Sequence, residues 1–535
     1  MKKYSVFLFI ISLVFSACGQ RSTNTEVASR PSPEYAANSN AMMSSNSSMS
    51  NSSMMSVELR RNDNFDQTSG ERYAEIDENP FLETVRAPLS TFSVDVDTAA
   101  YSNVRRFLND GQMPSKDTVR IEEMINYFEY DYPQPIGNLP FSVNTEVATC
   151  AWNAKNKIVS IALQGKKVSL EDAPPSNLVF LVDVSGSMNK PDRLPLVKQG
   201  LKLLARQLSS RDRVAIVVYA GKSGLVLPST SDERKILDAL ENFEAGGSTN
   251  GGEGIQLAYK VALDNFIPNG NNRVVLATDG DFNVGLQSDD ELVRLIEVKR
   301  QSGIFLSVLR FGTGNTNDSM MEKLADKGNG NYAYIDSQAE AQKALGEQAA
   351  GTLLTIAKDV KIQVEFNPAK VAGYRLIGYE NRLLANRDFK DDEKDAGDIG
   401  AGHSVTALYE IVPAGHAVEN DGIDLKYSKI EPSESNFGGE LLTVKLRYKE
   451  PKGSESKLLT QGLLDKENSI ENASTNLRFA SAVAGFGLLL RDSRYKGNAS
   501  YKKITQLAQS SLGSDLKNYR TDFLDLVRKA NVLRN

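Results

Sequence analysis

The stretch NLVFLVDVSGSM, residues 177–188, decides the fold, because a run of apolar residues ends there in a cluster of small polar ones. Three similar apolar runs follow it: RVAIVVYAG at 213–221, RVVLATDG at 273–280 and GIFLSVLRFG at 303–312. Strands that are apolar at nearly every position are buried on both faces, as in a parallel sheet covered by helices. We therefore expect an α/β domain built around these runs.

The segments between the runs have the period of amphipathic helices, at residues 194–208, 252–265, 289–302 and 318–327, and a last helix is expected over 337–357. Helices that alternate with buried strands supply the crossover connections of a doubly wound, mostly parallel, Rossmann-like sheet. Such sheets bind ligands outside the carboxyl ends of their strands. Functional residues are therefore expected at those ends.

Five oxygen-bearing side chains fall at or near these ends: Asp183, Ser185, Ser187, Thr249 and Asp279. Thr249 lies in the glycine-rich segment AGGSTNGGEG, whose backbone can approach another loop closely. Two carboxylates and three hydroxyls, with no sulfur or imidazole among them, suit Mg²⁺, or else Mn²⁺ or Ca²⁺, rather than zinc. An octahedral ion held by these groups and by waters would keep one position for an outside oxygen.

This set, Asp183-x-Ser185-x-Ser187 with Thr249 and Asp279, resembles the metal-ion-dependent adhesion site of von Willebrand factor type A (VWA) domains. The resemblance covers about residues 176–357. It implies that the serines contact the ion, that the threonine joins when ligand binds, and that the aspartates act partly through water. It also implies that an Asp or Glu of a protein partner completes the metal shell, and that the last helix of the domain can move.

The first residues have the pattern of a signal peptide, with Lys2 and Lys3 before an apolar run too short to span a membrane. The sequence Phe15-Ser16-Ala17-Cys18 resembles a lipobox, although Phe15 replaces the usual leucine, and Cys18 would then carry two acyl chains. Two chains anchor a protein stably, whereas one does not. An ordinary signal peptide with a stray thiol is the alternative.

We expect a cell-envelope location, and the outer membrane is favoured because Gly19 and Gln20 lack an aspartate that resembles an inner-membrane retention signal. More loosely, the whole chain is similar to bacterial lipoproteins in which a VWA domain lies between an N-terminal and a C-terminal module. STFSVDVDTAAYSNVRRFL, at 90–108, and CAWNAKNKIVSIALQGK, at 150–166, carry that similarity. It indicates architecture and no activity.

The predicted organisation has six segments. They are a signal peptide at 1–17, a lipid anchor with a Ser/Asn/Met-rich disordered tether at 18–78, an N-terminal α+β module at 79–173, the VWA domain at 174–357, a β-rich module at 358–465 and a C-terminal helical region at 466–535. The α+β module is expected to start with a strand-like stretch at 89–108.

Several other functions are disfavoured by the sequence. The formal net charge of −6 argues against nucleic acid and acidic head groups as partners. Gly221-Lys222-Ser223 lacks the upstream glycine of a P-loop, because Ile216 occupies that place, so no nucleotide is expected. Asp95 and Asp97 lack the glycine and glutamate spacing of a calcium-binding EF-hand.

An enzyme is not expected, because no nucleophile with a base can be named. Ser185 lacks the flanking glycines of a nucleophile elbow, and His403 and His416 lie outside the α/β domain. Cys150, in an alternating segment, is expected as a half-buried strand residue. We thus predict a membrane-anchored module that binds a protein partner through Mg²⁺. The alternatives are a structural envelope protein whose metal stiffens the loops and, less favoured, a metal-dependent hydrolase.

Overall fold

The computed structural model describes residues 64–65, 71–94, 97–169, 171–220, 223–247, 251–280, 289–314, 317–394, 396–418, 439–451 and 453–534. Arg60–Asn535 form one compact unit. The predicted signal peptide, Cys18 and nearly all of the predicted tether lie outside the described residues, as do Thr249, Asp95 and Lys222.

The predicted α/β domain is present, and its centre is a six-stranded sheet in the order β12-β11-β10-β7-β8-β9. Five strands are parallel: β7 (Ser176–Asp183), β8 (Arg213–Tyr219), β10 (Asn271–Thr278), β11 (Phe305–Phe311) and β12 (Tyr332–Ile335). Every residue of β7 is buried, as the continuous apolar run predicts. The edge strand β9 (Gly224–Thr230), which the sequence did not reveal, runs antiparallel to β8.

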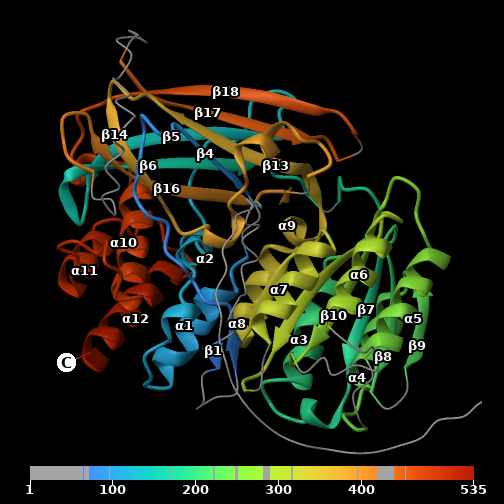
Figure 1. Ribbon diagram of the computed structural model, residues 1–535. Coiled ribbons are helices and arrows are strands. Elements are labelled where there is room, and N and C mark those ends of the chain that lie inside the picture. Colours follow the sequence, from blue (N-terminus) through green and yellow to red (C-terminus); the bar gives the residue numbers. More distant parts are fainter. Residues whose placement is uncertain are drawn as a thin grey trace, which may run out of the picture. The chain divides into compact units, whose positions relative to one another are not determined.

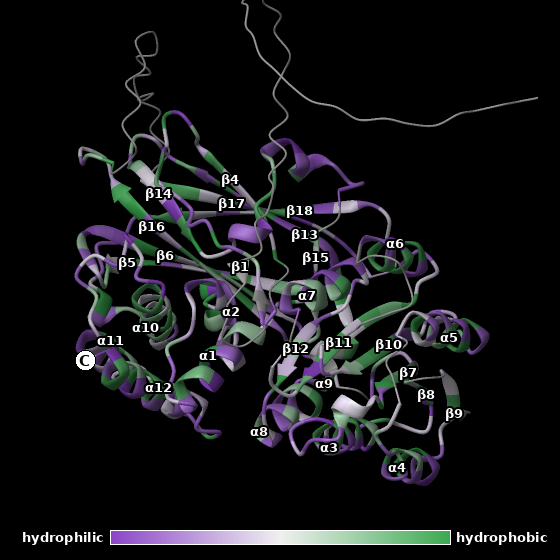
Figure 2. Ribbon diagram, turned by 60° about the horizontal axis from the view of Figure 1, so that its bottom comes forward, coloured by the Kyte–Doolittle hydropathy of each residue, from purple (hydrophilic) through white to green (hydrophobic). Residues whose placement is uncertain are grey.

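Helices cover both faces of this sheet (Figure 1). One face packs against α5 (Gly251–Asp264), α6 (Asp289–Arg300) and α7 (Asp318–Lys327), and the other against α3 (Leu194–Ala205) and α4 (Glu233–Glu241). In Figure 2, covering helices such as α5 and α6 show both green and purple residues, as amphipathic helices do. The four predicted crossover helices are therefore confirmed, and α4 is an addition.

The last helix of the domain is shorter than predicted. It consists of α8 (Gln338–Ala341), a π-helical turn η3 (Gln342–Glu347) and α9 (Ala349–Leu353), and the following strand begins at Thr355. The break between η3 and α9 falls at Gln348, and each of the two short segments contains a glycine, Gly346 or Gly351, a residue of low helix propensity. A Cβ at Gly351 would lie 2.7 Å from the ring of His403, so the chain passes closely against the neighbouring β structure there.

Two antiparallel sheets form the β-rich region. The first contains β4 (Leu89–Ser93), β13 (Thr355–Phe366), β15 (Gly397–Gly400), β17 (Glu440–Lys449) and β18 (Ser456–Leu464). The second has the order β3-β14-β16-β6-β5, with β3 (Leu82–Glu83), β5 (Phe141–Cys150), β6 (Asn153–Gly165), β14 (Val371–Ile377) and β16 (Ser404–Pro413). One apolar cluster takes residues from both, including Phe92, Ile362 and Tyr409, so the sheets form a sandwich.

The segments predicted as separate modules at 79–173 and 358–465 share both sheets. Strand β4 pairs with β13, and β6 pairs with β16 over eight residues from Lys157 to Gln164. The α/β domain is therefore inserted between two halves of one sandwich. Hydrophobic period identifies a strand in the sequence but not its partner, which is why the prediction treats the halves as independent. 

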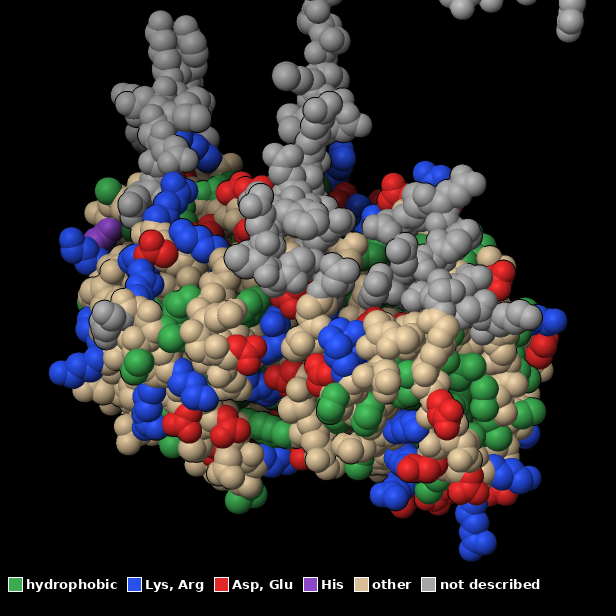
Figure 3. All heavy atoms as spheres, turned by 90° about the horizontal axis from the view of Figure 1, so that it is seen from below, with side chains coloured by type: hydrophobic (Ala, Val, Ile, Leu, Met, Phe, Trp, Pro, Cys, Tyr) green, Lys and Arg blue, Asp and Glu red, His purple; other side chains and the backbone are tan. Residues whose placement is uncertain are grey.

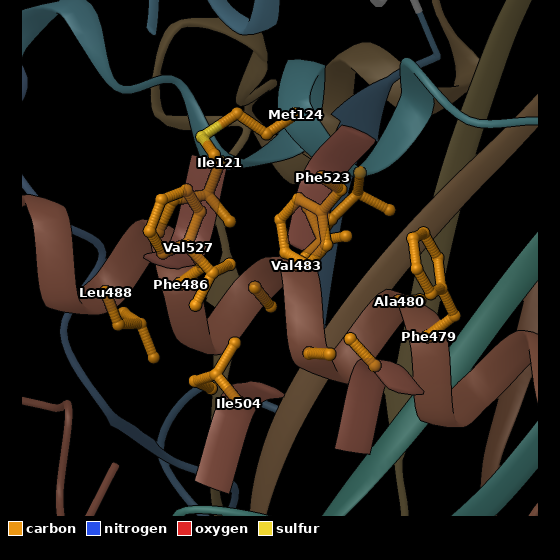
Figure 4. Packing of buried hydrophobic residues seen from close by; sticks show 14 of the residues in the cluster. Ile121, Met124, Phe479, Ala480, Val483, Phe486, Leu488, Ile504, Phe523 and Val527 are labelled. Carbon is orange, nitrogen blue, oxygen red and sulfur yellow. The ribbon is translucent and has the colours of Figure 1, made fainter. Parts of the chain in front are cut away.

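Helices α1 (Ala99–Asn109) and α2 (Ile121–Asn126) pack with the C-terminal helices α10 (Thr475–Leu490), α11 (Tyr501–Gln509) and α12 (Tyr519–Arg534). The strand-like stretch at 89–108 is thus partly wrong, because only 89–93 is a strand and the helical spacing of Tyr101, Val104 and Leu108 prevails afterwards. Figure 4 shows the α10 side chains Phe479, Val483 and Phe486 packed with Ile121, Phe523 and Val527.

The apolar residues at the centre of α10 are buried by this packing. A Cβ at Gly487 would lie 2.7 Å from Ile121, so glycine permits the close approach of α10 and α2. Among the described helices, none has both the length and the apolar character needed to cross a bilayer. Cys150 belongs to the same core and is fully buried rather than half-buried, and burial raises the pKa of its thiol.

Candidate metal centre

Strands β7 and β10 bring the predicted site residues to one edge of the sheet. They are parallel neighbours, with Val182 opposite Ala277, so Asp183 and Thr278 end the two strands side by side. On its other side β7 pairs with β8, the strand that follows it in the chain. The strand order therefore reverses at β7, which is the topological position where doubly wound sheets open a crevice.

The Asp-x-Ser-x-Ser turn has the local geometry expected of a shared oxygen site. The backbone N–H of Ser185 donates to Asp183 Oδ1 at 2.8 Å, and the Ser185 and Ser187 hydroxyl oxygens lie 3.0 Å apart. Asp183 and Ser185 are buried, whereas Ser187 is exposed. The turn thus presents its oxygens from a buried base to a solvent-facing side.

The loop that leads to Thr249 is fastened to this turn by the backbone. Gly186 N–H donates to the Gly247 carbonyl at 3.1 Å, and Gly246 N–H donates to the Val184 carbonyl at 2.7 Å. Helix α5 starts on the far side of the loop, at Gly251. Thr249 itself lies outside the described residues. The described residues just before it, Gly246 and Gly247, therefore lie against the turn that holds the two serines.

Asp183 is a fully buried carboxylate with hydroxyl partners that the sequence did not single out. Its Oδ2 accepts hydrogen bonds from the hydroxyls of Tyr219, at 3.1 Å, and Thr278, at 3.3 Å. Burial raises the pKa of Asp183 to about 6; the charge of Asp279 acts in the same direction, while hydrogen bonds from Ser185 and Tyr219 oppose it. A cation beside this carboxylate would stabilise its charged form.

Asp279 lies at the end of β10 and is bound by a residue that the sequence analysis missed. Arg193, directly before α3, donates from Nη1 to Asp279 Oδ2 and to the Ser187 carbonyl, the latter at 2.8 Å, and from Nη2 to the Thr313 carbonyl at 2.8 Å. Arg193 and Asp279 are both buried. A lone arginine before a helix carries no signal in a sequence, because its acceptors come from distant segments.

The residues present fit a hard divalent cation. The donors brought together here are the Asp183 carboxylate and the hydroxyls of Ser185 and Ser187. Within the described ranges no group of three or more His, Cys, Asp or Glu residues is placed to hold a metal. Asp183, Ser185 and Ser187 would hold the ion, with Asp279 and Thr249 as further predicted ligands. Neutral hydroxyl donors suit Mg²⁺ or Mn²⁺ and leave the ion electrophilic.

The other candidate residues have structural partners or lie apart. Asp97 accepts a hydrogen bond from the Tyr332 backbone at 2.8 Å and pairs with Arg382 at 3.3 Å. His403 lies between β15 and β16, and His416 follows β16. By their place in the chain, both histidines therefore belong to the sandwich and not to the α/β domain that carries Ser185.

Three family models match parts of the chain. Residues 178–281, which include all the predicted metal ligands, match the model of the von Willebrand factor type A domain. Residues 67–160 match a model described as von Willebrand factor. Residues 351–533 match the model of the C-terminal part of uncharacterized protein YfbK.

A relative from Escherichia coli (strain K12), uncharacterized protein YfbK, is 44% identical over 473 residues, which cover 86% of this chain and 81% of the relative. The chain belongs to the YfbK family. In this YfbK-family chain, the C-terminal match begins inside α9 and runs through the second half of the sandwich and the C-terminal helices. This chain therefore joins a VWA domain to a sandwich-plus-helix unit.

Two more distant likenesses have lower sequence identity. Human inter-alpha-trypsin inhibitor heavy chain H3 is 27% identical over 195 residues, which are 34% of this chain and 22% of that protein. A solved structure, von Willebrand factor type A from Catenulispora acidiphila, is 16% identical with a TM-score of 0.42 and covers 75% of this YfbK-family chain and 92% of its own. The VWA family match at 178–281 and the strand order together show a VWA-like α/β domain with a mostly parallel sheet, beside an antiparallel β region and C-terminal helices.

Proposed function

We propose that this chain is a lipid-anchored envelope protein whose VWA domain binds a protein partner through Mg²⁺. The observation that carries the proposal is the meeting of Asp183, Ser185 and Ser187 at the switch point of the sheet, next to strand β10, which Asp279 directly follows. Mg²⁺, when bound, would supply a positive charge and an open coordination position for an outside carboxylate. Ser187 is exposed and Ser185 is buried, so a ligand would approach from the Ser187 side.

The chain's own residues would prepare the site for that ligand. Tyr219 and Thr278 orient Asp183 by donating hydrogen bonds to its second oxygen. The bonds between the 183–187 turn and Gly246 and Gly247 hold the two loops in register. A site arranged before the ligand arrives loses less conformational freedom on binding. On this proposal the domain recognises an Asp or Glu side chain and carries out no reaction.

A capture experiment tests the proposal. The full chain is immobilised and exposed to envelope extract in Mg²⁺ or in EDTA, as wild type and as Asp183→Ala. We expect one or more proteins to be retained by wild type in Mg²⁺ and released by EDTA, and the variant to retain none of them. Retention that is equal in all arms would contradict metal-mediated binding. Metal uptake without Mg²⁺-dependent capture would instead favour a structural role, in which the ion stiffens the loops.

We propose that Cys18 anchors the chain, following its lipobox-like context. Replacing it, Cys18→Ala, should remove acyl labelling and shift the protein from the membrane pellet to the soluble fraction. Cells that express wild type or a variant are cultured with labelled palmitate and then fractionated, which measures both the acyl labelling and the membrane location. Cys150→Ala is the matched control, because that thiol is buried in a core and should not affect labelling. Unchanged labelling of Cys18→Ala would defeat lipid anchoring while leaving the metal-site proposal intact.

A further inference from the structure

Arg193 binds the metal-site edge of the sheet at three points. Its guanidinium donates to Asp279 Oδ2, to the Ser187 carbonyl and to the Thr313 carbonyl, so it connects the β10 end, the Asp-x-Ser-x-Ser turn and the loop after β11. Its side chain is 8% exposed, and that of Asp279 is 2% exposed. Water therefore screens this ion pair little, and the pair is a fixed part of the site.

The loop after β11 is built to admit the arginine. Gly312 has φ +77°, and a Cβ there would lie 2.5 Å from Arg193 Cγ and 2.6 Å from Nε. Glycine is therefore required both by the left-handed backbone and by the arginine stem. The next residue, Thr313, supplies the carbonyl that holds Nη2. The planar guanidinium satisfies separate acceptors in fixed directions, which a lysine cannot do.

The charge of Arg193 changes what the site can attract. Asp183 and Asp279 carry one negative charge each, so with a divalent ion and no arginine the formal charges would cancel. With Arg193 paired to Asp279, one positive charge remains. A positive, poorly screened metal-bound centre favours an anionic ligand over a neutral one. Before the ion binds, the site keeps a net negative charge, but Arg193 makes that charge smaller and so weakens the attraction for the ion.

We infer that Arg193 is a positioning and specificity-determining residue that offsets Asp279, so that the metal centre selects a carboxylate at the expense of metal affinity. The inference rests on the proposed function of the site. It concerns a residue outside the five predicted ligands. It predicts that removal of Arg193 strengthens metal binding and weakens carboxylate binding. A merely structural role of Arg193 would weaken both.

Manganese provides the probe that separates these effects. The full chain is titrated with Mn²⁺, with unbound Mn²⁺ followed by electron paramagnetic resonance, and acetate is then added while water proton relaxation reports displacement of metal-bound water. The variants are Arg193→Met, Arg193→Lys and the control Arg213→Met. Arg213 is exposed and starts β8, so it lies at the opposite end of the strands from the site.

We expect Arg193→Met to bind Mn²⁺ about 10-fold more tightly and to need about 10-fold more acetate for half-displacement of bound water. The loss of a neighbouring charge outweighs the loss of one hydrogen bond to the Ser187 carbonyl. Arg193→Lys, which keeps the charge, should stay within about 3-fold of wild type, a range expected where Coulomb energies are retained. Arg213→Met should not change either value.

Weaker binding of both Mn²⁺ and acetate by a folded Arg193→Met protein would overturn the inference. Equal values for that variant and wild type would do the same while leaving the proposed function standing. Absence of Mn²⁺ uptake by wild type would defeat both. If circular dichroism shows that Arg193→Met does not fold, Gly312→Ala replaces it, because the added Cβ would displace the guanidinium. That variant should likewise bind Mn²⁺ more tightly and need more acetate for half-displacement of bound water.

Discussion

Replacing Asp183 with alanine is expected to weaken Mg²⁺ or Mn²⁺ binding by at least about 100-fold. Asp183 is the carboxylate of the site that no cation in the described residues neutralises, because Arg193 pairs with Asp279 and not with Asp183. It is also fully buried, so its attraction for a divalent ion is poorly screened. Calorimetric titration of the full chain with Mn²⁺ measures the change.

Two controls separate the metal effect from damage to the fold. Asp238→Ala removes the same charge from the exposed side of α4 and should leave Mn²⁺ affinity unchanged. Asp183→Asn keeps an acceptor for Ser185, Tyr219 and Thr278, whose unsatisfied donors would cost about 1–3 kcal/mol in the alanine variant. Both Asp183 variants should lose metal; Mn²⁺ binding by either at wild-type affinity would exclude Asp183 as a ligand.

Arg120→Met is expected to lower the free energy of unfolding by about 3–5 kcal/mol, the cost of breaking a buried ion pair. Arg120 precedes α2, and its guanidinium pairs with Glu123 and, at 2.9 Å, with Asp318 of α7. These three side chains are 7%, 2% and 1% exposed. If the arginine is removed, the carboxylates of Glu123 and Asp318 stay buried but lose the positive charge that Arg120 places beside them.

Urea denaturation at two pH values tests this expectation. Burial acts to raise the pKa of Asp318, but Arg120 and Arg310 overcome it and hold the pKa below the ordinary value. A depressed folded-state pKa stabilises the protein above the unfolded pKa and loses that effect as pH falls. Arg120→Met removes one of the two arginines that oppose burial, so we expect the pKa of Asp318 to rise above its ordinary value in the variant. The buried carboxyl then takes up a proton more readily than in the unfolded chain as pH falls, so the loss of unfolding free energy relative to wild type should be smaller at pH 5 than at pH 7.

The matched control is Arg528→Met on α12, where the arginine pairs with Asp525 and both side chains are more than half exposed. Such a pair contributes about 0–1 kcal/mol, so unfolding should change little. A similar small change for Arg120→Met would contradict the view that this ion pair is essential to the contact between α2 and α7. That contact joins the VWA domain to the helices beside it.

Charged side chains on the surface are arranged differently from the buried ion pairs. On the face shown in Figure 3, Lys and Arg side chains are interspersed with Asp and Glu, with no broad area of one sign. Mixed surface charge favours solubility rather than attraction to a polyanion.

The sequence by itself determined the VWA sheet and the turn of Asp183, Ser185 and Ser187. A continuous apolar run reports burial on both faces, and three oxygens at alternate positions need only five residues of chain to converge. Those features depend on neighbours in the chain, so they can be read without knowledge of distant contacts. The shortened last helix and the strand-to-helix change at 89–108 were missed, because period alone leaves element ends uncertain.

Only the tertiary structure decided which distant segments meet. Arg193 and Asp279 are 86 residues apart, and β6 pairs with β16 across the whole inserted VWA domain. The hydroxyls of Tyr219 and Thr278 reach Asp183 because β8 and β10 flank β7. Such contacts follow from strand order and from burial of many side chains at once, and these are properties of the packed chain rather than of any local stretch.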